Sequence, residues 1–189
     1  MKNVVLFASG SGSNAQNIIK KLNQRSQNIK FTIFTNNPNA KVLEKAKNLN
    51  VPFEIFSKNE LLEGLVLKKL NVIKPDLIVL AGFLLKFPEN IVKLYPNKII
   101  NIHPALLPKY GGEGMYGINV HYAVLQNKET ETGITIHYVN ENYDEGKIIF
   151  QKSVSISNCK TPEEIAQKVL ALEHEYFPEV IFKILNPKS

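Results

Sequence analysis

The sequence of 189 residues is 44% hydrophobic and 21% charged, which is typical of a globular chain and predicts one domain over residues 1–189. No apolar run approaches the roughly 20 residues that a transmembrane helix needs, and the first expected strand starts too early to leave room for a signal peptide. We therefore expect a cytoplasmic protein with no membrane partner. The single cysteine, Cys159, permits no internal disulfide.

The formal charge of +6 does not by itself indicate a nucleic-acid-binding protein. The lysines are scattered along the expected helices and form no dense cluster. A mildly positive field attracts small phosphorylated molecules as well as it attracts a polyanion. We expect small-molecule substrates and no nucleic acid, while monomer and homodimer both remain open.

A glycine-rich loop follows the first expected strand. Residues 3–8 form a continuous apolar run, and residues 9–14 read Ser-Gly-Ser-Gly-Ser-Asn before an expected helix at 15–25. This order places backbone N–H groups and the helix dipole around an anion. The loop also fits the dinucleotide fingerprint, but the second expected strand, 30–35, ends without the carboxylate that holds a ribose. A phosphate monoester is therefore favoured over NAD, and a tight turn that binds nothing is the alternative.

The elements that follow alternate between helices and strands. We expect helices at residues 40–50 and 59–73, and strands at residues 52–56 and 76–81. Later segments at 133–139 and 147–155 predict an antiparallel pair. The pattern predicts an α/β fold: a doubly wound, mainly parallel sheet with helices on both faces and one antiparallel strand near the carboxyl terminus. Ligands of such folds bind at the carboxyl ends of the strands.

Asn101 and His103 lie where a strand beginning near Lys98 reaches this edge. Pro104 and Pro108 prevent regular pairing just beyond it. Because side chains two apart in a strand share a face, the amide and the imidazole would point into one pocket. Such a pair can stabilise an oxyanion and move a proton. The alternative is that both residues only satisfy backbone groups of a turn.

Two carboxylates, Asp144 and Glu173, complete the set of candidate site residues. Asp144 lies in the loop between the antiparallel strands, where Asp-Glu-Gly is also a common turn. Glu173 lies four residues from both Val169 and Phe177, on the apolar face of the last expected helix. An isolated buried carboxylate is costly, so Glu173 needs either a ligand or an internal ion pair. Pro178 is expected to kink or restart this helix.

Four motifs, at residues 9–14, 81–84, 101–110 and 144–146, occur together in this chain. In combination they resemble the phosphoribosylglycinamide formyltransferase family, the folate-dependent formyltransferases of purine synthesis. The resemblance covers nearly the whole chain and implies a single formyltransferase domain. It implies transfer of the formyl group of 10-formyltetrahydrofolate to the amine of N1-(5-phospho-D-ribosyl)glycinamide, in de novo purine (IMP) biosynthesis.

The resemblance also implies roles for individual residues. Asn101 and His103 would stabilise the oxyanion, while Asp144 would raise the pKa of His103 and assist proton transfer. Glu173 would bind the glycinamide portion of the acceptor. The co-substrate is 10-formyltetrahydrofolate, and no metal ion is required. The substrate phosphate would be held by Gly12, Ser13 and Asn14, and the folate by Leu84, Leu85, Lys86, Phe87 and Asn101.

Some positions depart from the family or leave their role open. An arginine that is common in the family at the position of Leu85 is absent. The segment 109–117 is longer than in better-known members, and it is either a lid over the ligands or a mobile surface insertion. His121 and His137 either face the site or are ordinary buried histidines, which is the interpretation favoured for His137.

Related enzymes share the Asn-x-His and Asp pattern. Methionyl-tRNA formyltransferases and formyltetrahydrofolate deformylases carry additional domains, for which we expect no room here. Sugar-nucleotide formyltransferases keep the same residues, and the phosphate loop at 9–14 is the feature that argues against all three. From other classes, a non-catalytic phosphate-binding module is a second hypothesis, and a basic nucleic-acid-binding domain is the weakest.

Overall fold

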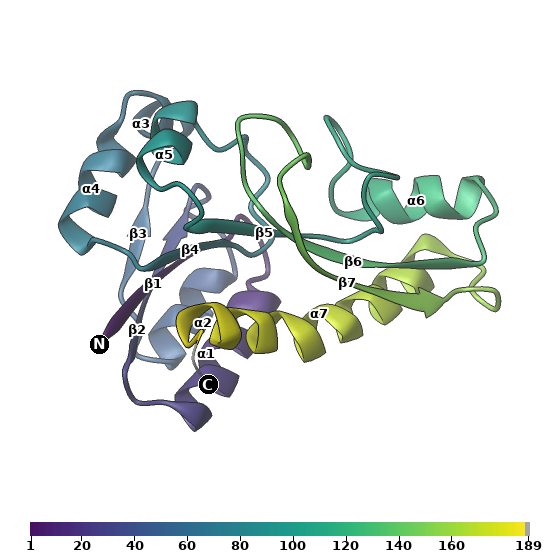
Figure 1. The fold of residues 1–189 in the computed structure, drawn as a ribbon, viewed down its shortest axis with the longest axis horizontal. Helices are drawn as coiled ribbons and strands as arrows, with labels where there is room; N and C mark the ends of the chain where they lie inside the picture. Colours follow the sequence, from purple (N-terminus) through teal and green to yellow (C-terminus); the bar gives the residue numbers. More distant parts are fainter. Residues whose placement is uncertain (188–189) are drawn as a thin grey trace.

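The computed structural model describes residues 1–187, and its centre is a seven-stranded sheet in the order β3-β2-β1-β4-β5-β6-β7 (Figure 1). The first five strands run parallel, β6 is antiparallel to β5, and β7 is antiparallel to β6. The predicted fold class is therefore confirmed. The strands are β1 (Lys2–Phe7), β2 (Ile29–Thr35), β3 (Phe53–Ile55), β4 (Leu77–Leu80), β5 (Ile99–His103), β6 (Glu131–Tyr138) and β7 (Ile148–Ser155).

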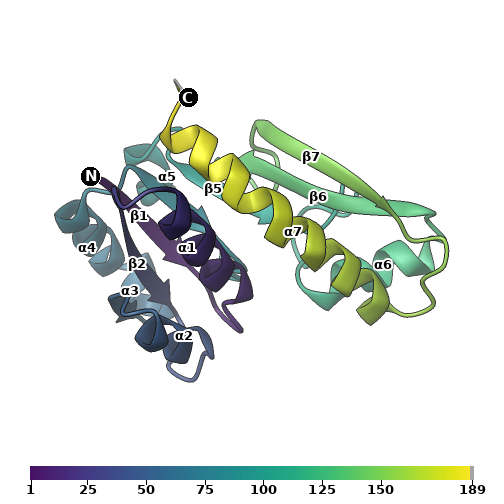
Figure 2. The ribbon, with the colours of Figure 1, turned by 90° about the horizontal axis from the view of Figure 1, so that it is seen from below.

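Helices cover both faces of the sheet (Figures 1 and 2). One face packs against α1 (Ser13–Arg25), α2 (Val42–Asn48), α6 (Ile118–Gln126) and α7 (Pro162–Leu185). The other face packs against α3 (Lys58–Leu62), α4 (Leu65–Ile73) and α5 (Glu89–Leu94).

Strand β1 explains why the sheet needs both layers. Val4 and Leu6 belong to one buried cluster and Val5 and Phe7 to the other, so every side chain of its central run is covered. Burying each such side chain contributes about 1.5–3 kcal/mol. The ring of Phe7 has four aromatic neighbours at centroid distances of 5.0 to 5.8 Å: Phe34, Phe56, Phe83 and Phe87.

The helix predicted over residues 59–73 is two helices, α3 and α4. Gly64 separates them with a φ of 84°, a left-handed conformation that glycine adopts without steric cost. Ser57 and Glu60 form a capping box at the start of α3. The apolar periodicity continued across the break, which is why the sequence pattern did not reveal it.

Pro178 lies inside α7 and does not divide it, so the predicted restart of the helix at this residue is wrong. A proline has no N–H to donate to the carbonyl of the residue four positions earlier, here His174. Two side chains of α1 supply the missing bonds: Asn17 Nδ2 donates to the His174 oxygen at 2.7 Å, and Lys21 Nζ donates at 2.9 Å. The contact with α1 therefore replaces the lost backbone bond, and it places Glu173 near the start of α1.

Candidate functional site

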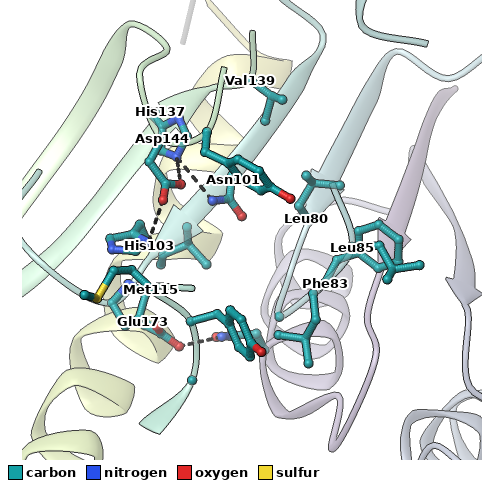
Figure 3. A pocket seen from close by; sticks show the side chains of 18 of the residues that line it. Leu80, Phe83, Leu85, Asn101, His103, Met115, His137, Val139, Asp144 and Glu173 are labelled. Carbon is teal, nitrogen blue, oxygen red and sulfur yellow. Dashed lines mark hydrogen bonds and ion pairs between the residues drawn. The ribbon is translucent and has the colours of Figure 1, made fainter. Parts of the chain in front are cut away.

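The carboxyl ends of β4 and β5, the loop after β1 and one side of α7 enclose a cavity of about 680 Å³ (Figure 3). It lies next to β1 and β4, where the strand order reverses, which is where open α/β sheets bind ligands. All of the predicted site residues except Gly12 line it.

Asn101 and His103 both belong to β5 and line the same cavity. The side chain of His103 is almost fully buried. In the antiparallel register with β6, Asn101 lies opposite His137, and His103 lies opposite Thr135. Thr135 Oγ1 donates to the Ala105 carbonyl at 2.7 Å and so holds the turn that leaves the strand.

His137 orients Asn101. Its Nδ1 is 3.0 Å from the Tyr138 carbonyl, which can only accept, so Nδ1 donates and Nε2 is left to accept from Asn101 Nδ2 at 3.2 Å. His137 is a hydrogen-bonded buried histidine, but it also lines the cavity, so it faces the site, which was not the interpretation favoured from the sequence. The sequence pattern missed the contact with Asn101 because it depends on the β5–β6 register.

Asp144 approaches the strand residues from the loop after β6. Its Oδ2 is 3.5 Å from His103 Nδ1 and accepts the Gly112 N–H at 3.0 Å, and its Oδ1 is 3.6 Å from His137 Nε2. Burial alone raises the pKa of Asp144, but His137, the charge of His103 and the Gly112 N–H together bring it below its ordinary value. The carboxylate form is therefore the stable one at neutral pH.

The pKa of His103 is lower than its ordinary value, even though Asp144 raises it as predicted from the sequence. Burial is the largest influence and lowers the pKa, while Asp144 and the Tyr110 carbonyl raise it without compensating. Both ring nitrogens nevertheless face acceptors, because the Tyr110 oxygen is 2.7 Å from Nε2. If Nδ1 becomes protonated, the Asp144 carboxylate is therefore close enough to pair with it.

Within the predicted phosphate loop, Ser13 and Asn14 line the cavity, and Gly12 does not. Gly12 precedes α1 with a φ of 66°, and a Cβ on it would lie 2.3 Å from Val42 Cγ2. The glycine is needed for this turn and for its close approach to α2. Gly12 and Ser13 lie at the start of α1, where backbone N–H groups without a helical acceptor favour an anion, and the Ser13 N–H donates to Ser11 Oγ at 3.4 Å.

Asn14 and Glu173 form a buried pair, and Glu173 lies near the bottom of the view in Figure 3. Asn14 Nδ2 donates to Glu173 Oε2 at 2.6 Å, whereas Asn14 Oδ1 has no hydrogen-bond partner among residues 1–187. Burial raises the pKa of Glu173 to about 7, and the bond from Asn14 offsets only part of that effect. The predicted need of Glu173 for a partner is thus met in part by an amide instead of an ion pair.

The predicted folate-binding segment forms one wall of the cavity, with Leu84, Leu85, Lys86 and Phe87 all lining it. Phe87 is largely buried in the aromatic cluster around Phe7, while Leu84 is half exposed. The Lys86 ammonium lies 5.3 Å from the centre of the Tyr143 ring, which belongs to the facing wall. The wall offers the apolar surface that a flat ring system needs.

The glycine-rich segment also belongs to the cavity, since residues 112–117 line it and Met115 packs against the main core. This placement fits a covering segment better than a surface insertion. His121 of α6 lines the cavity too, and burial lowers its pKa to about 4. Within the described part of the chain, its Nδ1 has no hydrogen-bond partner. Nothing in the sequence separated His121 from an ordinary core histidine.

Residues 1–187 contain neither a helix that could span a membrane nor a cluster of side chains that could hold a metal ion. None of the helices described there is long and apolar enough to cross a membrane. In the same part of the chain, no group of three or more His, Cys, Asp or Glu side chains could hold a metal ion.

Comparison with known proteins identifies the family. A family model described as formyl transferase matches residues 2–181. Phosphoribosylglycinamide formyltransferase of Bacillus subtilis is 35% identical, with 98% of this chain and 96% of the relative covered. The chloroplastic enzyme of Arabidopsis thaliana is 40% identical, with 99% of this chain covered, and this chain spans 66% of that relative's length.

Solved structures agree with these sequence matches. The crystal structure of phosphoribosylglycinamide formyltransferase from Bacillus halodurans superposes with a TM-score of 0.89 at 33% identity, with 100% of this chain and 97% of the other covered. The whole sheet, including β6 and β7, therefore has a counterpart in a solved structure. Together with the family match over residues 2–181, this establishes that the chain belongs to the formyl transferase family.

Proposed function

We propose that this protein transfers the formyl group of 10-formyltetrahydrofolate to the amine of phosphoribosylglycinamide, and that the chain acts as one formyltransferase domain. The observation that carries the proposal is the arrangement of Asn101, His103 and Asp144 in one cavity. Asp144 lies 3.5 Å from His103 and 3.6 Å from His137, and His137 lies 3.2 Å from Asn101. The names of its relatives support this choice of substrates.

The reaction needs stabilisation of negative charge on the formyl oxygen. The amine nitrogen forms a bond to the formyl carbon, and the oxygen of the tetrahedral species becomes negative. Asn101 uses one amide hydrogen for His137, which leaves the second to donate to that oxygen. His103, once protonated, adds positive charge beside the same site.

The attacking amine must also lose a proton. Asp144 is ionised at neutral pH because its pKa is lowered, so it can accept a proton directly or through water. The bond between the formyl carbon and the folate nitrogen then breaks, and that nitrogen takes up a proton. Because His103 Nδ1 lies 3.5 Å from Asp144 Oδ2, the pair can pass a proton between them.

The remaining residues would hold the two substrates. The start of α1, with Gly12, Ser13 and Asn14, would hold the phosphate, and Glu173 would accept hydrogen bonds from the glycinamide portion. On the other side, the wall of Leu84, Leu85, Lys86 and Phe87 would contact the folate together with Asn101. With the two substrates bound in this way, the formyl group would lie between the glycinamide side and the folate side of the cavity, close to Asn101.

A spectrophotometric assay with 10-formyl-5,8-dideazafolate tests the proposal. We expect the deformylated folate to appear only when phosphoribosylglycinamide is present. Release of the formyl group without an acceptor would instead indicate a deformylase, and no release in either case would contradict formyl transfer to this acceptor. Inorganic phosphate should inhibit by competition with the glycinamide if the start of α1 holds its phosphate.

A further inference from the structure

Tyr110 lies outside the lining of the main cavity, yet its backbone reaches the site. Its carbonyl oxygen is 2.7 Å from His103 Nε2. Because a carbonyl can only accept, Nε2 must carry a hydrogen. In the neutral ring the lone pair of Nδ1 is then directed at Asp144, 3.5 Å away. Protons therefore enter and leave His103 at Nδ1, beside the carboxylate.

Residues 110–112 hold His103 and Asp144 at the same time. Tyr110 supplies the carbonyl for His103, and Gly112 donates its N–H to Asp144 Oδ2 at 3.0 Å. Between them, a Cβ on Gly111 would lie 2.5 Å from Leu107 Cδ2 and 3.3 Å from the Asp144 Cβ. The turn formed by residues 110–112 is therefore packed tightly against His103 and Asp144. Its geometry sets the relative position of these two side chains.

Tyr110 itself adopts a φ of 58°, a left-handed conformation that is uncommon for a large side chain. Such a conformation persists where neighbouring contacts hold it. Those contacts lie on the side away from the cavity. The phenol donates to Glu129 Oε1 at 2.9 Å and accepts from Asn127 Nδ2 at 3.0 Å. Lys109 Nζ is 3.1 Å from the same Glu129 oxygen.

These hydrogen bonds and the covalent structure of Tyr110 together connect the turn after α6 with His103. The connection runs from Glu129 and Asn127, in that turn, through the Tyr110 phenol and carbonyl to the His103 ring. We infer that Tyr110 is a positioning residue: its phenol, anchored on Glu129 and Asn127, holds the turn that keeps the hydrogen of neutral His103 on Nε2 and its Nδ1 towards Asp144. Only the kinetic consequence of this inference rests on the proposed function.

Replacing the phenol tests the inference directly. Tyr110→Phe keeps the ring and removes the anchor. Histidine side-chain ¹⁵N–¹H spectra between pH 4 and 8 report the tautomer and pKa of His103, whose signal is assigned from its absence in His103→Asn. We expect the Nε2–H form in the wild type, and a mixture of tautomers with a lower pKa in Tyr110→Phe. The kcat should fall about 3- to 10-fold, the size of one weakened hydrogen bond, with KM values changed less than about 2-fold.

Variants of Glu129 and Lys109 distinguish loss of the hydrogen bond made by the Tyr110 phenol from a general change in packing. Glu129→Ala should reproduce the spectral change, whereas Glu129→Gln should not, because its amide oxygen still accepts from the phenol. Lys109→Gln removes a different partner of Glu129 and should leave the His103 spectrum unchanged.

The inference is overturned if Tyr110→Phe and Glu129→Ala both leave the tautomer and the pKa of His103 as in the wild type. Should Tyr110→Phe fail to fold, Glu129→Ala decides alone, since it changes a partly exposed side chain. If the spectra change as expected but the wild type transfers no formyl group, the proposed function fails and the positioning role of Tyr110 stands.

Discussion

The cavity is lined by two carboxylates, the buried Glu173 and the partly buried Asp144, and their pKa values are shifted in opposite directions. The pKa of Glu173 is raised to about 7, and that of Asp144 is lowered. Burial is the largest influence on each and raises both. Glu173 receives one hydrogen bond from the neutral amide of Asn14, whereas Asp144 has the Gly112 N–H and lies beside two imidazoles. Glu173 is more deeply buried and has fewer partners than Asp144, and both differences raise its pKa relative to that of Asp144.

The difference divides the chemistry between the two carboxylates. Asp144 stays ionised across the neutral range and can accept protons during turnover. Glu173 changes its protonation near neutral pH and has too few partners of its own, so a ligand that donates hydrogen bonds would complete its surroundings. Substituting each carboxylate, and then the partner of Glu173, tests this contrast.

The largest expected effect is on Asp144. In Asp144→Asn the shape is kept but the charge and the proton-accepting oxygen are lost, so kcat should fall by roughly 10² to 10⁴-fold, the usual range for an acid–base group. The pKa of His103 should also fall further, because Asp144 is a contribution that raises it. Steady-state kinetics and histidine spectra would measure both. A kcat within about 10-fold of the wild type would contradict the assignment.

Glu173→Gln should stabilise the fold above neutral pH. Below pH 4.5, the ordinary pKa, Glu173 is protonated in both the folded and unfolded chain, so its contribution to stability is fully present. As the pH rises towards the folded pKa of about 7, the unfolded chain ionises first and this contribution is lost. The difference amounts to about 3 kcal/mol.

Glutamine cannot ionise, so the variant should resemble the wild type at pH 4.5 and be about 3 kcal/mol more stable at pH 8. Urea unfolding at the two pH values measures the free energy of unfolding. If the two proteins differ by the same amount at both pH values, the raised pKa of Glu173 is wrong. If the assay with phosphoribosylglycinamide shows turnover in the wild type, the same variant should raise the KM for that substrate, in line with the proposed binding role.

Removing the partner of Glu173 should have the smallest effect. Asn14→Ala deletes the hydrogen bond of 2.6 Å, so the pKa of Glu173 should rise further and the fold should lose about 1 kcal/mol at neutral pH. Carboxyl ¹³C spectra between pH 5 and 9 follow the titration. Ser13→Ala is the neighbouring control and should leave the Glu173 titration in place. An unchanged titration in Asn14→Ala would show that the bond does not set the proton affinity of Glu173.

Much of the scaffold could be predicted from local patterns. Continuous apolar runs identified β1 and β4, and the alternation of helices and strands identified the mainly parallel sheet. The two errors in helix boundaries have local causes that need coordinates to see. Gly64 takes a left-handed φ between α3 and α4, and α1 supplies the hydrogen bonds that let α7 pass through Pro178.

The sequence by itself determined which side chains could do chemistry: an amide and an imidazole two apart in one strand, a loop carboxylate, and a carboxylate on the apolar face of a helix. Only the tertiary structure decided their states. His137 meets Asn101 through the strand register, Asn14 meets Glu173 across 159 positions of the chain, and the His103 nitrogens are fixed by the 110–112 turn and Asp144. Proton affinity depends on burial and on hydrogen-bond partners, and here both come from segments that are distant in sequence.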